Sequence, residues 1–415
     1  MNSNEGQNNT NEVIAKKVNL WNINYINTLI VTLIINVAAM ILITILPLYT
    51  KTIGGDNFVA GLLTTVLTIS AFLCRPIFGK MIDSVGRRRV LILGLGMFAL
   101  STLMLLASYH LYVLLFLRLL QGVGLSAYST ALGTILSDVV PNERLSEGVG
   151  YFGIASTIAM AIGPSIGLFI TEKFSYQATY IVSSCIALSG ILFANFIKYE
   201  KERASIKLNM DEPYVISTAS IETTSQLKKS GFIEKTALRP CFVMFFTVMA
   251  ISAVFSFMPL FGLERNIDNI GLFFTFYALS MIFSRLLTGR IADRYGFAFA
   301  YIPGMIITFL LFLTLSFAYS LPMVLLAAVF YGVGYGTVQP VVNAVVIKLC
   351  PPERRGAANA TYYATLDIGF GLGSFVWGYV SQVAGFTTVF LICAALVAIS
   401  VLIYYVVLHR QIHLK

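Results

Sequence analysis

The stretch Arg75–Val90, RPIFGKMIDSVGRRRV, concentrates charge between two long apolar runs. It holds an Asp, two glycines and three consecutive arginines, whereas the whole chain is 57% hydrophobic and only 11% charged. A mean hydropathy of +0.82 with 13% aromatic residues lies well outside the range of soluble globular proteins. The pattern indicates a polar connection inside a membrane protein.

Apolar stretches of about 20 residues, the length that crosses a bilayer, recur along the chain between short polar breaks. They predict an all-α integral membrane protein with twelve spans, approximately 22–47, 57–80, 90–108, 111–136, 146–170, 176–198, 238–262, 267–290, 298–319, 321–349, 356–382 and 386–408. Residues 1–19 do not resemble a cleavable signal, so we expect the first span to be retained.

A polar segment of mixed charge, residues 199–237, divides the spans into two groups of six and is not apolar enough to fold alone. Lys and Arg gather on alternate connections, and with the two termini added to that side the split is 22 against 3. The positive-inside rule therefore predicts that both termini are cytoplasmic. The expected parts are a tail (1–21), an N-terminal half (22–198), a cytoplasmic linker (199–237), a C-terminal half (238–408) and a tail (409–415).

Several classes of function are disfavoured by what the spans contain. The net charge of +9 is explained by topology, so no nucleic-acid partner is needed. The five cysteines form no CxxC pair and the three histidines are scattered at span ends, so we expect no disulfide, metal site or cofactor. A membrane enzyme would need clustered His and carboxylates, and a receptor a sizeable soluble domain. The chain offers neither.

The two halves repeat at a constant offset of 210 residues. The offset maps Gly61, Arg75, Gly79, Asp83, Gly86, Gly122, Gly124 and Gly163 onto Gly271, Arg285, Gly289, Asp293, Gly296, Gly332, Gly334 and Gly373. Such a correspondence predicts two pseudo-symmetric six-helix halves with one orientation, as in parallel transporter repeats.

The segment 79–89 resembles the G-x-L-x-D-R-x-G-R-K/R signature of the major facilitator superfamily, and 289–296 resembles a degenerate second copy. Ser84 and Phe297 depart from the pattern. The resemblance implies the twelve-helix fold of that superfamily, a multi-pass monomer in a bacterial cytoplasmic membrane, and alternating access. It also implies a cytoplasmic latch against helix 11, formed by Gly79, Asp83, Gly86, Arg87 and Arg88, with Gly289 and Asp293 as its second copy. The alternative for Arg87–Arg89 is the positive-inside rule alone.

Two further motifs resemble those of drug:proton antiporters in this superfamily. Arg118 and Gln121 match the helix-4 pattern R-x-x-Q-G-x-G/A, which implies a role in proton coupling or substrate binding. A structural Arg bonded to backbone carbonyls is the alternative. Gly163, Pro164 and Gly167 match part of the helix-5 antiporter motif, in which Ala159 replaces the leading glycine. The partial match favours export.

Asp367 is the one carboxylate near the centre of any predicted span, where a carboxylate either titrates or pairs. Polar and aromatic stripes on other spans are expected to converge with it on a midplane cavity. The candidate cavity residues are Asn36, Gln121, Tyr128, Tyr331, Tyr335, Gln339, Asn343 and Tyr363. For each of them, an ordinary interhelical hydrogen bond is the alternative.

These features together favour a secondary transporter that exports small amphipathic or drug-like molecules in exchange for H⁺. In this hypothesis Asp367 releases its proton before the solute binds, and Arg118 modulates that step. Export of sugars or of metal-chelating metabolites, and proton-coupled import of a small polar solute, remain alternatives.

Overall fold

The structure is a computed structural model, which describes residues 20–141, 144–198, 234–351 and 355–408. Residues 1–19 of the expected N-terminal tail, the expected C-terminal tail, most of the linker, and residues 142–143 and 352–354 lie outside these ranges. The side chains of Asp83, Asp293, Arg290 and Asn359 are also outside the description, as is Gly289.

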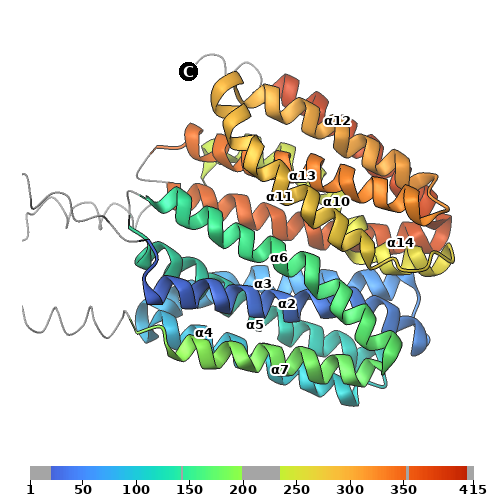
Figure 1. The fold of residues 1–415 in the computed structure, drawn as a ribbon, viewed down its shortest axis with the longest axis horizontal. Coiled ribbons are helices and arrows are strands. Elements are labelled where there is room, and N and C mark those ends of the chain that lie inside the picture. Colours follow the sequence, from blue (N-terminus) through green and yellow to red (C-terminus); the bar gives the residue numbers. More distant parts are fainter. Residues whose placement is uncertain (1–19, 142–143, 199–233, 352–354, 409–415) are drawn as a thin grey trace, which may run out of the picture.

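The described residues are helical almost throughout. The N-terminal half comprises α2 (Ile23–Thr52), α3 (Asn57–Val85), α4 (Arg87–Leu103), η1 (Met104–Ala107), α5 (Leu111–Val139), α6 (Leu145–Lys173) and α7 (Tyr176–Asn195). The C-terminal half comprises η3 (Lys235–Ala237), α10 (Leu238–Glu264), α11 (Leu272–Tyr295), α12 (Phe297–Ser316), α13 (Leu321–Leu349), α14 (Arg355–Ile403) and η5 (Tyr404–Leu408). Figure 1 shows the two halves as separate groups of roughly aligned helices.

Ten of these helical stretches are long and apolar enough to cross a membrane, and Leu272–Thr288 is a shorter apolar helix. One of the ten, Ala360–Val406, contains two spans, because Gly385 interrupts α14 with φ 74° and ψ 170°. The predicted count of twelve spans is consistent with this architecture. Gly385 falls between the predicted spans 356–382 and 386–408.

The two halves meet at one end of the molecule, here called the closed end, where α2 connects to α3 and α10 to α11. Asn57 donates its backbone N–H to Gln382 Oε1 over 3.0 Å, and Phe58 packs edge-on against Phe375 with ring centroids 5.3 Å apart. A Cβ on Gly61 would lie 3.1 Å from the Gly378 Cα atom, so α3 and α14 are in close backbone contact there.

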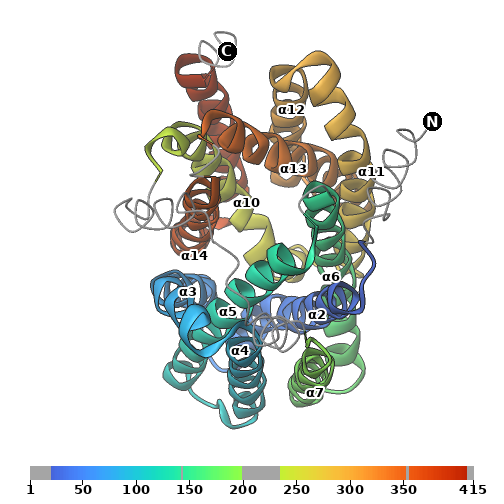
Figure 2. The ribbon, with the colours of Figure 1, turned by 90° about the vertical axis from the view of Figure 1, so that its left-hand side faces the viewer.

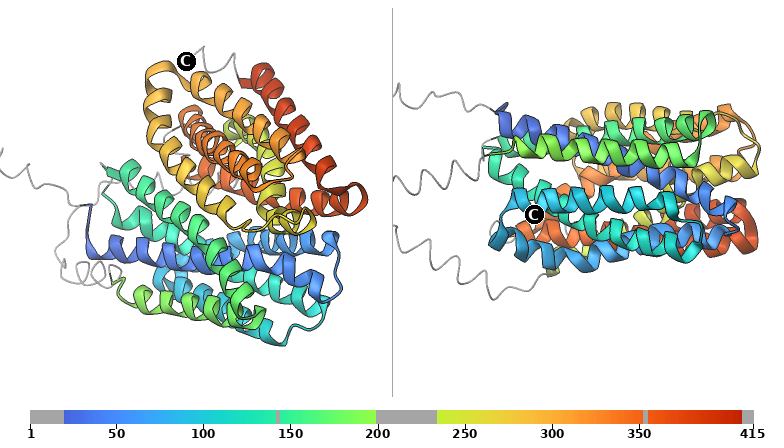
Figure 3. Two further views of the ribbon diagram at one scale, coloured as in Figure 1. Left: turned by 45° about the vertical axis from the view of Figure 1, so that its right-hand side comes forward. Right: turned by 90° about the horizontal axis from the view of Figure 1, so that it is seen from below.

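At the opposite end, here called the open end, the halves diverge (Figure 3, left). Viewed from the open end, α3 lies beside α14 on one flank and α6 beside α11 on the other (Figure 2). The open end carries the connections at Gly86 and Gly296, including the triple arginine of the opening stretch.

Gly86 and Gly296, at equivalent positions of the repeat, each lie at a tight turn between two helices. Gly86 has φ 104° and ψ 150°, and Gly296 has φ 93° and ψ 161°, a region in which side-chain-bearing residues are strained. Each glycine ends one helix and begins the next. Gly79 differs: it lies inside α3, where a Cβ would meet no heavy atom within 4 Å. No close backbone approach is present at Gly79 in this structure, because the halves are apart at that end, and its place in the latch stays a prediction.

This contrast predicts opposite effects of two alanine substitutions. Gly86→Ala should destabilise the protein by about 1–3 kcal/mol because of its backbone conformation. Gly79→Ala should stabilise it by roughly 0.5–1 kcal/mol because alanine favours a helix interior. The unfolding temperature of the purified protein in detergent measures both. Equal shifts in the same direction would contradict this account of the turn.

Candidate functional site

An ion pair joins the two halves at the centre of the molecule. Arg75 on α3 donates from Nε and Nη2 to Oδ2 of Asp367 on α14, at 2.7 and 2.6 Å. The side chains are 30% and 20% exposed, so the pair is accessible to water and to small solutes. Asp367 is thus paired in this state, and a proton would have to compete with Arg75 for it.

The second half contains the counterpart of this pair, with one difference. The 210-residue offset maps Arg75 onto Arg285 and Thr157 onto Asp367. Arg285 on α11 donates from Nη1 to the Thr157 hydroxyl on α6 over 2.8 Å. The pseudo-symmetry thus places an arginine of one half against the other half twice. Within the described part of the chain, Arg75 has a carboxylate partner at this position and Arg285 has a hydroxyl.

The other contacts of Arg285 are also uncharged. Its Nη1 donates to the Gly153 carbonyl over 3.4 Å and its Nη2 to Gln339 Oε1 over 2.8 Å. Its Nε has no hydrogen-bond partner among the described residues. The side chain is half-buried in the contact between α11 and α6.

Tyrosines from α11, α13 and α14 surround Arg285 at electrostatic range: Tyr277, Tyr335, Tyr362 and Tyr363. Tyr277 and Tyr331 are each 1% exposed, and their rings pack with centroids 4.8 Å apart. Neither hydroxyl has a hydrogen-bond partner within the described part of the chain. Of the predicted cavity residues, Tyr331, Tyr335, Gln339 and Tyr363 therefore gather around Arg285.

The remaining predicted residues lie elsewhere. Gln121 and Tyr128 are buried within the N-terminal half, where Tyr128 packs edge-on against Phe98. Asn36 donates to the Thr32 carbonyl of its own helix over 2.8 Å. Asn343 is half-buried on α13, and its Oδ1 has no hydrogen-bond partner in the described ranges. Contrary to the expectation from the sequence, the candidate cavity residues therefore do not all gather around Asp367 in this structure.

Arg118 is also remote from Asp367. It is 1% exposed inside the N-terminal half, where its Nη1 donates to Gln121 Oε1 over 3.0 Å and Gln121 in turn donates to the Thr102 hydroxyl over 3.2 Å. The charged neighbour of Asp367 is Arg75 instead. A role of Arg118 in proton coupling stays a prediction. Arg118 makes no direct contact with Asp367 in this structure.

The predicted latch residues lie at the open end, but Arg87 makes its described ion pair within its own half. Its Nε lies 3.2 Å from Asp138 Oδ2 at the end of α5, and Arg88 Nη2 donates to Asn195 Oδ1 at the end of α7 over 2.7 Å. A latch against the other half stays a prediction for a state in which this end closes.

The antiporter-motif residues pack α6 against α2. A Cβ on Gly163 would lie 2.6 Å from the Met40 Cβ atom, and one on Gly167 would lie 3.1 Å from Ile45 Cγ1. Pro164 lies between them inside α6. These residues hold the helix that presents Thr157 to Arg285.

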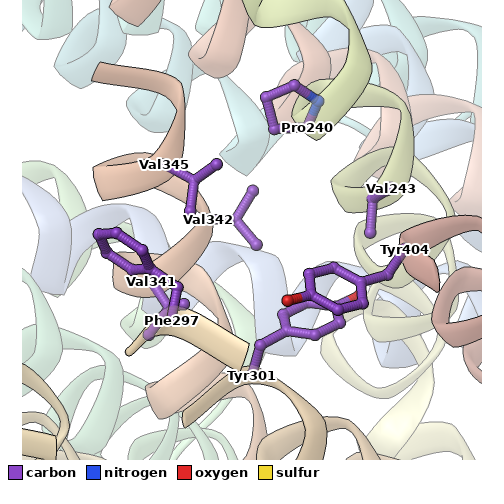
Figure 4. A pocket seen from close by; sticks show the side chains of 8 residues that line it. All are labelled: Pro240, Val243, Phe297, Tyr301, Val341, Val342, Val345 and Tyr404. Atoms are coloured by element: carbon purple, nitrogen blue, oxygen red, sulfur yellow. The ribbon is translucent and has the colours of Figure 1, made fainter. Parts of the chain in front are cut away.

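A small pocket inside the C-terminal half differs from this site. Figure 4 shows it lined by apolar and aromatic side chains, including Val243, Val342 and Phe297, with Tyr301 and Tyr404 stacked at 4.4 Å between ring centroids. Its lining residues include no Asp, Glu, Lys, Arg or His. We therefore place the candidate site at the two arginines between the halves.

Sequence reasoning missed Arg75, Arg285 and Thr157 as site residues. The available signal was the pair of arginines at equivalent repeat positions within spans. An arginine at membrane depth costs roughly 2.5–3.5 kcal/mol on insertion scales, so its retention in both halves indicates a partner or a function.

A polytopic helical protein with two repeated halves and charged residues between them has the architecture of a secondary transporter. A sequence model of the Major Facilitator Superfamily matches residues 28–269 and 266–414. The chain therefore belongs to the major facilitator superfamily, whose members are transporters and not enzymes.

The relatives that the chain matches include proteins named for export or for drug resistance. The chain is 26% identical over 385 residues to the staphylopine export protein of Staphylococcus aureus, covering 90% of this chain and 94% of that protein. It is 25% identical over 355 residues to multidrug resistance protein 2 of Bacillus subtilis, covering 81% and 84%.

Solved structures share the fold at lower identity. The nucleoside transporter NupG aligns with a TM-score of 0.69 at 14% identity, covering 93% of this chain and 100% of that one. A POT family transporter crystallised with 5-aminolevulinic acid aligns with a TM-score of 0.71 at 14% identity, covering 92% and 94%.

Proposed function

We propose that this transporter is a proton-coupled exporter of small amphipathic molecules that works by alternating access. The observation that carries the proposal is the Arg75–Asp367 ion pair, which bridges the halves and is partly exposed. A proton on Asp367 removes its negative charge and so releases Arg75. Proton binding is thereby linked to the contact between α3 and α14, whose rearrangement alternating access requires.

The open end is proposed to face the cytoplasm, because Arg87, Arg88 and Arg89 lie there and positive charge favours that side. A solute would then enter from the cytoplasm while Asp367 is ionised. One proton moving inward across 100 mV supplies about 2.3 kcal/mol, enough for roughly a 50-fold gradient. The relatives named for drug resistance support export. Export of one particular solute is the second candidate, favoured by the relative named for staphylopine export.

The test is a proton-flux assay in inside-out membrane vesicles that contain the protein. A dye reports the acid interior while lipophilic cations, neutral drugs, amphipathic carboxylates and sugars are added in turn. Export by antiport predicts that at least one compound dissipates the gradient only when the protein is present. Compounds that dissipate it equally in protein-free vesicles are carried by the lipid. If no compound acts through the protein, the proposal fails.

A further inference from the structure

We infer that Arg285 binds the carboxylate of an anionic amphipathic solute. At the position where the other half has Asp367, the site around Arg285 has an uncharged threonine. The inference rests on the proposed transport function and names its substrate class. At two equivalent positions of the halves, Arg75 has the carboxylate of Asp367 as its partner, whereas Arg285 has the neutral hydroxyl of Thr157.

The contacts of Arg285 support an anion site. Its three hydrogen-bond acceptors, on Thr157, Gly153 and Gln339, are all neutral. The ion pairs found among the described residues do not include Arg285, and its Nε is without a partner there. Even a half-buried cation within a membrane span is costly unless it has a partner, and an anion would supply one. A guanidinium offers paired donors in the geometry that a carboxylate accepts.

The tyrosines near Arg285 indicate what else the solute carries. The hydroxyls of Tyr277 and Tyr331 are buried and have no partner among the described residues, so each can donate to a second oxygen acceptor. The rings of Tyr277, Tyr331 and Tyr335 pack against one another and are 1–4% exposed. They make the surroundings of Arg285 aromatic, which suits an aromatic or otherwise apolar body attached to the carboxylate.

The arrangement separates two tasks that would otherwise conflict. Asp367 with Arg75 is reserved for the proton, while Arg285 holds the solute's charge on the other flank of the contact between the halves. Arg75 links α3 to the C-terminal half, and Arg285 links α11 to the N-terminal half. A proton on Asp367 and a solute on Arg285 therefore both act on the movement of the halves relative to each other.

The test uses three probes that share one aromatic body and differ in charge: naphthylacetate, its neutral amide naphthylacetamide, and the cation naphthylethylamine. Binding to purified full-length protein in detergent is measured by calorimetry. Wild type should bind the carboxylate roughly tenfold or more tightly than the amide, as expected for charge-assisted hydrogen bonds. The cation should bind most weakly.

Two variants of one position supply the control. Thr157→Asp places a carboxylate within reach of Arg285 and should abolish the preference for naphthylacetate over the amide. Thr157→Asn has the same shape without the charge and should keep the preference. The ratio of the two affinities is insensitive to a general loss of folding. Loss of the preference in both variants, or no preference in wild type, would overturn the inference.

The anion site at Arg285 and the proposed proton-coupled export can fail independently of each other. If naphthylacetate binding depends on position 157 as stated but no compound moves protons in vesicles, the anion site stands and proton-coupled export does not. If proton flux is present without a carboxylate preference, the reverse holds.

Discussion

Asp367→Asn is expected to abolish solute-driven proton flux while leaving exchange of solute for solute intact. Asparagine keeps the shape of the side chain but cannot bind and release a proton. Exchange between the two sides needs no net proton movement, so it should persist if the substitution spares the fold. The two rates are measured in vesicles, with the ΔpH dye for flux and a labelled solute for exchange.

Two variants serve as controls for this result. Asp367→Glu retains a titrating carboxylate and should restore part of the flux. The double variant Arg75→Gln/Asp367→Asn removes the orphaned arginine and should be at least as stable as Asp367→Asn alone. Breaking a fully buried pair costs roughly 3–5 kcal/mol, and this pair should cost less because it is partly exposed. Undiminished proton flux in Asp367→Asn would place the coupling group elsewhere.

Locking the closed end should stop transport almost completely. In a background without the five native cysteines, Asn57→Cys and Gln382→Cys place thiols at a contact between the halves. A short bifunctional thiol reagent should join them, and transport should fall to the level of protein-free vesicles because the halves can no longer part there. Uptake of labelled solute measures the loss.

A crosslink within one half is the matched control. Arg265 and Thr387 lie at the closed end, both in the C-terminal half, and are joined by a 2.6 Å hydrogen bond. Crosslinked Arg265→Cys/Thr387→Cys should retain transport. If both crosslinks abolish transport equally, or if the first leaves it unchanged, separation of the halves at this end is not part of the cycle.

The fold was predictable because its signals are local or repeated. Apolar length determines each span, and Gly86 and Gly296 mark turns whose backbone only glycine adopts without strain. The 210-residue offset predicted two equivalent halves. The latch role implied for Gly79 stays a prediction, because it depends on how closely the halves approach at the open end, which no single span encodes.

The candidate site was predictable only in part. Asp367 was evident as a lone intramembrane carboxylate, and Gln339, Tyr331, Tyr335 and Tyr363 as a polar and aromatic set. The identity of their partners required the packing of α3 against α14 and of α11 against α6. Thr157 carries no chemical signal by itself. It becomes informative only when the structure places it opposite Arg285, in the role that Asp367 has for Arg75.

The most direct test of the central claim is to count protons released when solute binds. Purified protein in lightly buffered detergent solution receives a compound that proved active in the vesicle panel, and the change in pH is recorded over a range of starting pH values. The account predicts proton release by wild type in part of that range and none by Asp367→Asn. No release by wild type at any pH, or equal release by the variant, would contradict it.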